Sequence, residues 1–483
     1  MAVLASRSTA LRRALTLLVF LVTLSVAGSS ILNKRQLGGL LDEWMYLGAH
    51  LTQYRTLGFE GQPTVFRPPG YPAFISGLMV LFVDPPKAFD MEYLRQGARV
   101  VYWAQAVLLA ATATLLFLWL CRRFRPGIAA FGALWFGTNA YAVVLAGLLH
   151  YAVLHLLLLV VCCYTTELAA AEAPPGIWRW ARAGIVWGVS TLVRPVSLLW
   201  PPFLAVLCGV RFRKLAPAGR ALGACLLGML LVVAPWTLRN AGLTSHLIPV
   251  NAQAWTALWR MTVAPWERAP NHYNWYSTIH THYEPMIAGV TGSSTYNYDS
   301  FVRHVVEIEA VARAETFRNL RTQPKVYLHN CLTAFLSFNL DLNTVLVQVF
   351  EHLQTPGATY SGSFDWFMPG NPQDFHSKAS RRWLSISFSL MTAAAFAGAW
   401  YGWRRRDPFL VVPGIAYACV MSAHVFVYMD MPYYYVKLPF VAVFACALVD
   451  SLSWRGPGAL TVGDGLAVGL LLGSVATTTR VLV

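Results

Sequence analysis

The first residues of this chain whose types and spacing suit chemistry are an acidic pair, Asp42 and Glu43. A carboxylate beside a hydroxyl group can act as a general base, and two carboxylates can hold a divalent cation. Glu43, Tyr46 and His50 fall on one face of a predicted short helix. The opposite, apolar face is formed by Trp44, Leu47, Leu51 and Tyr54. Because acidic residues also cap helices, a structural role for Asp42 stays an alternative to catalysis.

Basic residues at four later positions could bind an anion. Arg67 lies among the prolines of the rigid stretch 66–72, and its guanidinium could bind phosphate oxygens or anchor at a lipid headgroup. Arg194 interrupts an apolar stretch, where an arginine is costly and usually faces a cavity or a partner, although it can also snorkel to the interface. Arg239 follows an aromatic anchor at a predicted helix exit, and Lys437 lies in a tyrosine-rich stretch near the same surface.

The composition places these residues in a membrane protein. Of the 483 residues, 56% are hydrophobic and 12% are charged, and the mean hydropathy is +0.49, which excludes a soluble enzyme. Long apolar stretches predict membrane-crossing helices, and the alternating pattern of a β-barrel is missing, so the fold class is all-α. The net charge of +15 comes from arginines beside apolar stretches, which mark cytoplasmic loops and not a nucleic-acid partner.

Cysteine and histidine residues do not form a metal motif. Cys162, Cys163, Cys225 and Cys446 lie inside apolar stretches at spacings that match neither a zinc site nor a disulfide framework. The central polar region holds several histidines, but no two-histidine helix motif joins them (His246, His272, His280 and His282). We expect the cysteines to be packing residues and do not favour a histidine metal site.

Charge bias beside the apolar stretches predicts about ten transmembrane helices. Arg7, Arg12 and Arg13 place the N-terminus in the cytoplasm before a span at about 14–32, with a cleaved signal peptide as the alternative. The first outer loop then covers 33–96 and contains a short apolar piece at 71–83 that lies at the interface. Further spans are expected near 97–120, 128–145, 148–168, 221–236, 384–403, 409–428, 436–452 and 466–483. Between the cytoplasmic markers Arg182 and Arg211 the chain must cross outward and return, with Arg194 midway near the outer surface.

Three regions follow from this topology. Residues 1–240 form an N-terminal transmembrane module that includes the first outer loop. Residues 241–382 are the most polar part and form an extracytoplasmic loop region with interfacial helices, among them an apolar piece at 326–350. Residues 383–483 form the C-terminal transmembrane helices. No internal repeat supports an inverted duplication of the kind that transporters use.

Four separated motifs, taken in order, resemble the GT-C superfamily of membrane glycosyltransferases that use polyprenyl-phosphate-linked sugars. The resemblance is greatest to the branch with protein O-mannosyltransferases and lipid A aminoarabinose transferases, and it covers roughly 1–450. The motifs are Asp42-Glu43 with Tyr46, the stretch 67–72 (Arg-Pro-Pro-Gly-Tyr-Pro), 192–195 (Leu-Val-Arg-Pro) and 234–240 (Ala-Pro-Trp-Thr-Leu-Arg-Asn). A fifth stretch, Tyr-Val-Lys-Leu-Pro at 435–439, echoes a late basic position of the family.

The resemblance implies that this multi-pass integral membrane protein is a glycosyltransferase acting on the outer face of its membrane. That membrane would be the inner membrane if the source is bacterial. An acid of the first outer loop would orient or deprotonate the acceptor, and Asp42 matches that position, with Glu43 beside it. The leaving lipid phosphate would be stabilised by basic residues and in some members by a divalent cation, and the matching positions here are Arg67, Arg194, Arg239 and Lys437. Tyr46, His50 and Tyr71 are expected to contact substrate. The acceptor would be a hydroxyl or phosphate of a protein, lipid or glycan, and attack would invert the anomeric carbon.

Two departures from the family pattern concern the charged groups. Many relatives carry an acid between the third and fourth helices, where this chain has His150 and Tyr151, so a second catalytic acid and its metal are in doubt. Lys437 stands where many relatives have arginine. Its ammonium group cannot form the two parallel hydrogen bonds to phosphate that a guanidinium forms. The alternatives are a transporter or flippase of lipid-linked glycans and a non-catalytic membrane scaffold, in which Asp42 would only cap a helix.

Overall fold

The computed structural model describes residues 2–32, 43–59, 61–84, 90–172, 176–265, 282, 284–292, 302–340, 378–405, 407–427 and 435–452. These residues form helices joined by short turns, with one two-residue hairpin of β1 (Gly58–Phe59) and β2 (Gln62–Pro63). The predicted all-α class is therefore confirmed. Asp42 and the predicted span at 466–483 lie outside the described residues.

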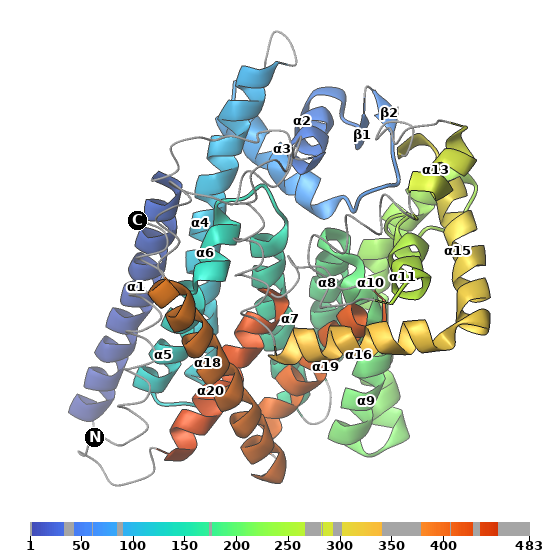
Figure 1. Ribbon diagram of the computed structural model, residues 1–483. Helices are drawn as coiled ribbons and strands as arrows, with labels where there is room; N and C mark the ends of the chain where they lie inside the picture. The colour runs from blue at the N-terminus through green and yellow to red at the C-terminus, as the bar shows by residue number, and fades with distance from the viewer. Residues whose placement is uncertain are drawn as a thin grey trace.

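Among the described residues, seven segments are long and apolar enough to cross a membrane. Most belong to helices that run along one direction in the bundle (Figure 1). The segments are Thr9–Leu32 of α1 (Ala2–Leu32), α4 (Met91–Leu120), α7 (Ala152–Ala171), Pro195–Phe212 with η1 (Pro195–Leu199) and α9 (Trp200–Phe212), α10 (Leu215–Thr244), Phe409–Phe426 of α19 (Pro408–Phe426), and Tyr435–Leu452 with α20 (Leu438–Leu452). The protein is thus a multi-pass membrane protein.

The span predicted at 128–145 is broken in two. Helix α5 (Pro126–Gly137) and α6 (Ala140–Ala146) meet at a bend of 53°, and an eighth span results if the pair is counted as one. The break has a local cause, because the Asn139 side chain accepts a hydrogen bond from the Tyr141 N–H and starts a new helix. An asparagine inside an apolar run was the available signal for this break.

The structure does not confirm the predicted total of about ten spans. Helix α8 (Ile177–Val193) has 17 residues and stops because Pro195 holds the preceding Arg194 in an extended conformation. Helix α18 (Lys378–Arg405) is continuous over 28 residues but is not among the segments apolar enough to span. Helix α10 runs on through Pro235 to Thr244, so the helix exit predicted at 234–240 is wrong. The Thr237 hydroxyl donates to the Val233 carbonyl within this turn.

Glycines bring the backbones of α8 and α10 together. A Cβ atom on Gly184 would collide with the Cys225 carbonyl, and one on Gly228 would collide with the Ala181 carbonyl. Such small residues permit the close approach of helices in a bilayer, where packing and not hydrophobicity drives association. This contact fixes the C-terminal end of α8, where Arg194 follows.

The first outer loop forms a cap at one end of the bundle (Figure 1). The predicted short helix is present as α2 (Glu43–Tyr54), and the predicted interfacial piece is α3 (Gly70–Phe82). At 13 residues, α3 is about 20 Å long and too short to cross the hydrocarbon layer. Together α2, α3 and the hairpin hold the motifs of this loop against the ends of the spans.

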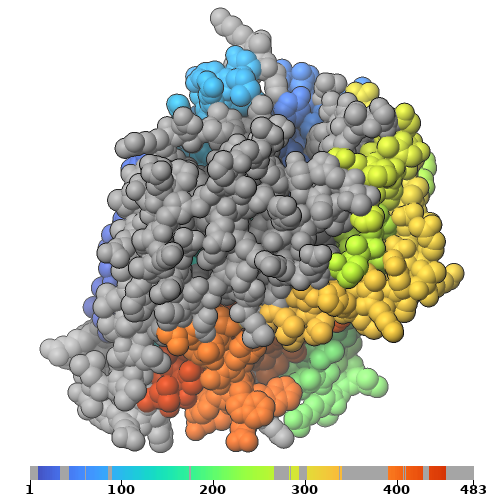
Figure 2. Space-filling view, viewed as in Figure 1, coloured from blue at the N-terminus to red at the C-terminus, as the bar shows by residue number. Residues whose placement is uncertain are grey.

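Three further helices pack into a separate small core at the side of this cap, namely α11 (Ala254–Val263), α13 (Glu284–Thr291) and α15 (Val305–Thr322). The next helix, α16 (Pro324–Leu340), contributes its buried apolar residues to the main core, and Figure 2 shows α13, α15 and α16 at the molecular surface. The small core includes Trp259, Ile287 and Ile308 and takes in Val65 and Phe66 from the first outer loop. Helix α16 runs across the bundle in Figure 1 and is not among the possible spans. The rest of the interfacial piece predicted at 326–350 lies outside the described residues.

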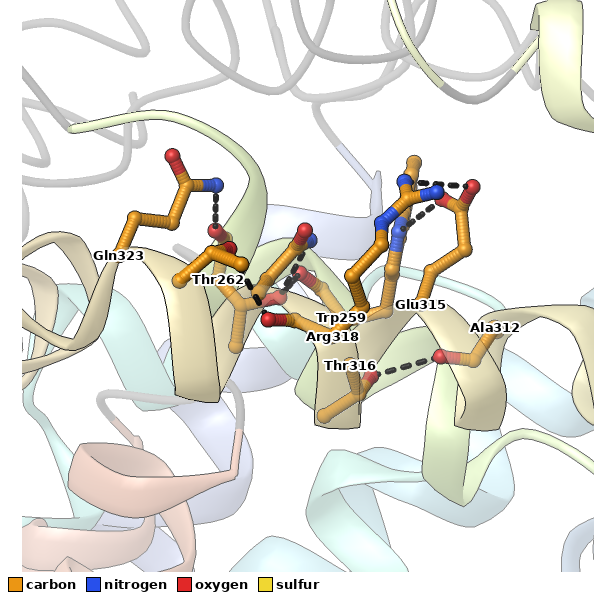
Figure 3. A network of polar contacts seen from close by, with 9 residues as sticks. Trp259, Thr262, Ala312, Glu315, Thr316, Arg318 and Gln323 are labelled. Atoms are coloured by element: carbon orange, nitrogen blue, oxygen red, sulfur yellow. Dashed lines mark hydrogen bonds and ion pairs between the residues drawn. The ribbon is translucent and has the colours of Figure 1, made fainter.

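Polar contacts between α11 and α15 stiffen this side region (Figure 3). The indole N–H of Trp259 donates to Glu315 at 3.0 Å, and Glu315 also pairs with Arg318. At the C-terminal end of α15, the side chain of Gln323 donates to the carbonyl oxygen of Thr262 at 3.1 Å. The two helices are therefore held in a fixed register beside the first outer loop.

Candidate functional site

Glu43 and Arg67, two of the predicted site residues, form an ion pair. Glu43 is the first residue of α2, and Arg67 precedes α3. Their side chains are 18% and 25% exposed, so the pair is accessible without lying free on the surface. Arg67 also donates to the Gln253 side chain at 2.8 Å and stacks over Trp44, with its guanidinium carbon 5.2 Å from the ring centroid. The acidic motif and the proline-rich motif are thus joined directly.

An aromatic wall connects Arg67 to Arg194. Trp44 lies edge-on to Tyr71 and Tyr151, with centroids 5.8 and 5.3 Å apart, and the Arg194 guanidinium lies 5.5 Å from the centroid of Tyr151. Tyr71 is fully buried, and its hydroxyl donates to Gln105 at 2.9 Å. The Tyr71 hydroxyl is therefore used inside the protein, while its ring forms part of the wall.

Arg194 is only 7% exposed and lies between the end of α8 and η1. Its guanidinium donates to the Tyr435 hydroxyl at 2.8 Å and to Nε2 of His424 at 3.3 Å, and it lies 5.5 Å from the Tyr435 ring centroid. Neither a tyrosine hydroxyl nor an accepting imidazole nitrogen is negatively charged, so these two contacts orient the guanidinium and do not themselves neutralise it. An oriented, largely desolvated cation of this kind is suited to an anionic group.

His150 lies in the field of both arginines. It follows α6 and lies against Tyr151 with the ring centroids 4.1 Å apart and the planes tilted by 33°, and its Nδ1 accepts the Ala152 N–H at 3.2 Å. Burial and then the charges of Arg194 and Arg67 lower the pKa of His150 to about 3. The ring is consequently neutral at physiological pH and adds no further positive charge beside Arg194.

Lys437 is 1% exposed and donates to the Phe338 carbonyl in the last turn of α16. The Phe338 ring stacks on His424 at 5.6 Å. Lys437 is thus linked through Phe338 and His424 to Arg194. In this structure its ammonium group stabilises the end of a helix, where cations are favourable.

Three predicted site residues instead hold the first outer loop. Arg239 donates to the carbonyl oxygens of Thr64 at 2.7 Å and Leu57 at 3.2 Å. His50 is buried, donates from Nδ1 to the Thr56 carbonyl at 2.8 Å and accepts the Gly61 N–H at 2.7 Å, and burial lowers its pKa. Tyr46 stacks on Phe59 of β1 at 5.5 Å. These contacts favour positioning roles over the substrate and phosphate contacts expected from the sequence.

The described part of the site does not contain a recognisable set of metal-ligating side chains. Among the described residues, no group of three histidine, cysteine, aspartate or glutamate side chains converges as metal ligands do. The Glu43 carboxylate is paired with Arg67, and Asp42, its neighbour in sequence, lies outside the described residues. We therefore derive no step that depends on a metal.

Close backbone contact joins the proline-rich motif to the segment before Arg194. We predict that Gly70→Ala lowers activity at this site by roughly 100-fold, because such losses follow from shifts near 1 Å. The added Cβ would lie 2.6 Å from Cγ2 of Val193 and 2.8 Å from the Leu192 carbonyl oxygen, forcing α3 away from the end of α8. The measurement is the initial rate in lipid together with the melting temperature.

Gly77→Ala is the matched control for this change. Gly77 lies on the same helix, and a Cβ there would meet nothing within 4 Å. Alanine in place of a helical glycine should then preserve activity and add up to about 1 kcal/mol of stability. Equal rates for the two variants would show that the contact does not position the motifs.

Glu309 links the side region to Arg67. Both carboxylate oxygens of this buried residue accept backbone N–H groups at the start of α11, from Trp255 at 2.8 Å and Thr256 at 2.9 Å. This contact satisfies donors that a helix N-terminus leaves open. It fixes Gln253, which caps α11 and accepts the hydrogen bond from Arg67.

Glu309 should make the stability of the folded protein depend on pH. Burial is the largest effect on its pKa and raises it above the ordinary value of 4.5, against the hydrogen bonds and Arg260, which lower it. The folded protein therefore holds this proton more tightly than the unfolded chain, so stability is greatest below 4.5 and falls as pH rises through the raised pKa. Glu309→Gln should remove that slope from melting temperatures measured between pH 4 and 8. Glu307→Gln, an exposed position on the same helix, should keep it.

Sequence reasoning missed three members of the site. His155 in α7 and His424 in α19 are buried polar residues inside apolar spans, which is the signal that identified Arg194. Tyr151 was noted only because it stands beside His150. Its role depends on contacts with Trp44 and Arg194, which no local pattern shows.

Comparison with known proteins places the fold. No family model and no curated protein matches the sequence. The structure resembles the oligosaccharyltransferase of Archaeoglobus fulgidus in its apo form, with a TM-score of 0.52 and 13% identity over 98% of this chain and 55% of that one. It also resembles that enzyme, AglB, in complex with an inhibitory peptide and a dolichol-phosphate, with a TM-score of 0.51 and 12% identity over 97% and 55% of the two chains. This chain spans about half the length of that protein.

A weaker match exists to ArnT from Cupriavidus metallidurans bound to undecaprenyl phosphate, with a TM-score of 0.41 and 14% identity over 96% of this chain and 88% of that one. The fold assignment therefore rests on the archaeal enzyme, a GT-C glycosyltransferase. The resemblance predicted from the motifs is confirmed at the level of the fold. A structure of the archaeal enzyme is a complex with zinc and sulfate.

Proposed function

We propose that this chain, which has the GT-C fold, transfers a sugar from a polyprenyl-phosphate-linked donor to an acceptor on the outer face of the membrane. The observation that carries the proposal is the placement of Arg67 and Arg194 at the two ends of one aromatic wall, with neutral His150 in the field of both. That arrangement suits a lipid phosphate. The acidic motif begins α2 directly beside Arg67.

The chemistry balances as a single displacement. The acceptor oxygen attacks the anomeric carbon with inversion, and the bond from that carbon to the phosphate oxygen breaks. Asp42 takes the proton of an acceptor hydroxyl, or orients an acceptor phosphate, as a general base adjacent to the reacting centre can. Negative charge grows on the departing polyprenyl phosphate, and Arg194 with Arg67 stabilises it where the reaction gains most. Glu43 holds Arg67 in place through the ion pair.

The occupants of similar structures support this assignment of the anion. The archaeal oligosaccharyltransferase was seen with a dolichol-phosphate, which is a polyprenyl-type lipid phosphate. In this chain the matching ligand would be a polyprenyl-phosphate sugar, and the acceptor would be a protein, lipid or glycan. A divalent cation would sit near Asp42 and Glu43 if this chain uses one.

The fate of the lipid carrier tests this proposal against transport. Purified protein in lipid is given a polyprenyl-phosphate sugar and three acceptors: a peptide containing serine and threonine, a glycolipid and an oligosaccharide. A transferase releases polyprenyl monophosphate in step with glycosylated product of inverted anomeric configuration, followed by mass spectrometry and NMR. Movement of the intact donor across liposomes without release of the carrier would instead identify a transporter or flippase.

A further inference from the structure

Arg194 is held by a buried polar cluster that comes from four separate parts of the chain. The cluster consists of Tyr435 before α20, His424 near the end of α19, His155 in the first turn of α7 and Arg194 itself. All four residues are less than 9% exposed. Water is thus largely excluded, and each hydrogen bond must be matched inside the protein.

The arginine fixes the direction of its own hydrogen bonds. A guanidinium can only donate, so the Tyr435 oxygen accepts from Arg194 at 2.8 Å. The Tyr435 oxygen also lies 2.9 Å from Nδ1 of His155, and the hydrogen bond between them ties the His155 ring to the group that accepts from Arg194. Because Nε2 of His424 accepts from Arg194 at 3.3 Å, His424 is neutral with its proton on Nδ1.

We propose that His155 and His424 are positioning residues of Arg194, and that Tyr435 relays the orientation of His155 to the guanidinium. The inference rests on the proposed function and deepens it by naming what keeps the phosphate-binding arginine in place. The two histidines restrain the guanidinium at different nitrogens. His155 holds the Tyr435 hydroxyl, which accepts from one terminal nitrogen, and His424 accepts from the other. Such fixed donors need no reorganisation when charge develops.

Packing around His424 also connects the cluster to helix α16. The ring stacks on Phe338 of α16 with an angle of 22° between the planes, and Lys437 donates to the Phe338 carbonyl. Helix α16 is therefore a wall of the cluster. The His155 ring lies edge-on to Tyr435, with the ring centroids 5.8 Å apart, and is hydrogen-bonded to the hydroxyl of the same residue. Tyr435 therefore restrains both the position and the direction of this ring.

Matched substitutions separate positioning from simple packing. Asparagine at 155 keeps an acceptor close to the Nδ1 position, and glutamine at 424 keeps one close to the Nε2 position, whereas leucine keeps neither. We expect His155→Leu, His424→Leu and Tyr435→Phe to lower kcat on the order of tenfold, as loss of an orienting partner does. His155→Asn and His424→Gln should recover most of that loss, while KM for the donor stays within about twofold. Equal kcat values for the leucine variant and the amide variant at either position would overturn the proposal.

A spectroscopic measurement keeps the test independent of the transfer reaction. Nitrogen NMR of ¹⁵N-histidine-labelled protein in lipid should show His424 as the neutral Nδ1–H tautomer at pH 7, with its signals assigned by their loss in His424→Leu. The Nδ1 signal of His155 should shift in Tyr435→Phe, which removes its hydrogen-bond partner. A charged His424 ring, its Nε2–H tautomer, or an unchanged His155 signal in Tyr435→Phe would overturn the proposal. If no donor is turned over, the proposed function fails, while these signals still decide the structural inference.

Discussion

Arg194→Lys is expected to lower sugar transfer by roughly 100- to 1,000-fold, the loss seen when one preorganised donor to a developing oxyanion is removed. The variant keeps a positive charge. It cannot keep the fork that reaches Tyr435 and His424 together, because an ammonium is a single point donor. The measurement is kcat and KM with a polyprenyl-phosphate sugar.

The control for this variant is Arg95→Ala. Arg95 is 51% exposed, and its pairing with Glu92 at 3.9 Å is a surface contact worth little. Its rate should match that of the unmodified protein. A lysine variant with the same kcat as the Arg95 variant would show that Arg194 does not stabilise the leaving phosphate.

Asp42→Asn is expected to lower kcat by roughly 100- to 10,000-fold, the usual contribution of a general base. Asp42 immediately precedes Glu43, the first described residue of α2, so a capping role is the alternative to be separated from catalysis. Asparagine caps helices about as well as aspartate, so the substitution removes the base and preserves the cap. The rate and the melting temperature are measured on the same preparation.

Asp90→Asn provides the matched control for capping. Asp90 caps α4 by accepting the Tyr93 N–H at 2.9 Å, so this variant changes a true cap. We expect the two variants to melt at similar temperatures and only Asp42→Asn to lose activity. Full activity in Asp42→Asn would leave capping as the role of this residue.

Local pattern was sufficient for much of the site's framework. The apolar spacing of Trp44 and Leu47 predicted α2, and the prolines around Arg67 predicted the turn before α3. Arg194 stood out because a cation in an apolar stretch requires an explanation. In each case the information lies within a few residues of the chain.

The contacts of these residues could not be predicted in the same way. Arg239 reaches the Thr64 carbonyl 175 residues away, and Arg194 reaches Tyr435 across 241 residues. Which of several outer-surface cations faces the substrate, and which supports a loop, depends on these distant partners. Spacing alone therefore gave Arg239 and Arg194 the same predicted role, whereas their contacts in the structure differ.

The most direct test is transfer of radiolabelled sugar from a panel of polyprenyl-phosphate sugars, with the unmodified protein and Asp42→Asn compared in lipid. The proposed function predicts turnover with at least one donor by the unmodified protein and a loss of roughly 100-fold or more in the variant, at an unchanged melting temperature. Absence of turnover with every donor by folded, unmodified protein would contradict it. Equal turnover by the two proteins would contradict the role of Asp42 as the base.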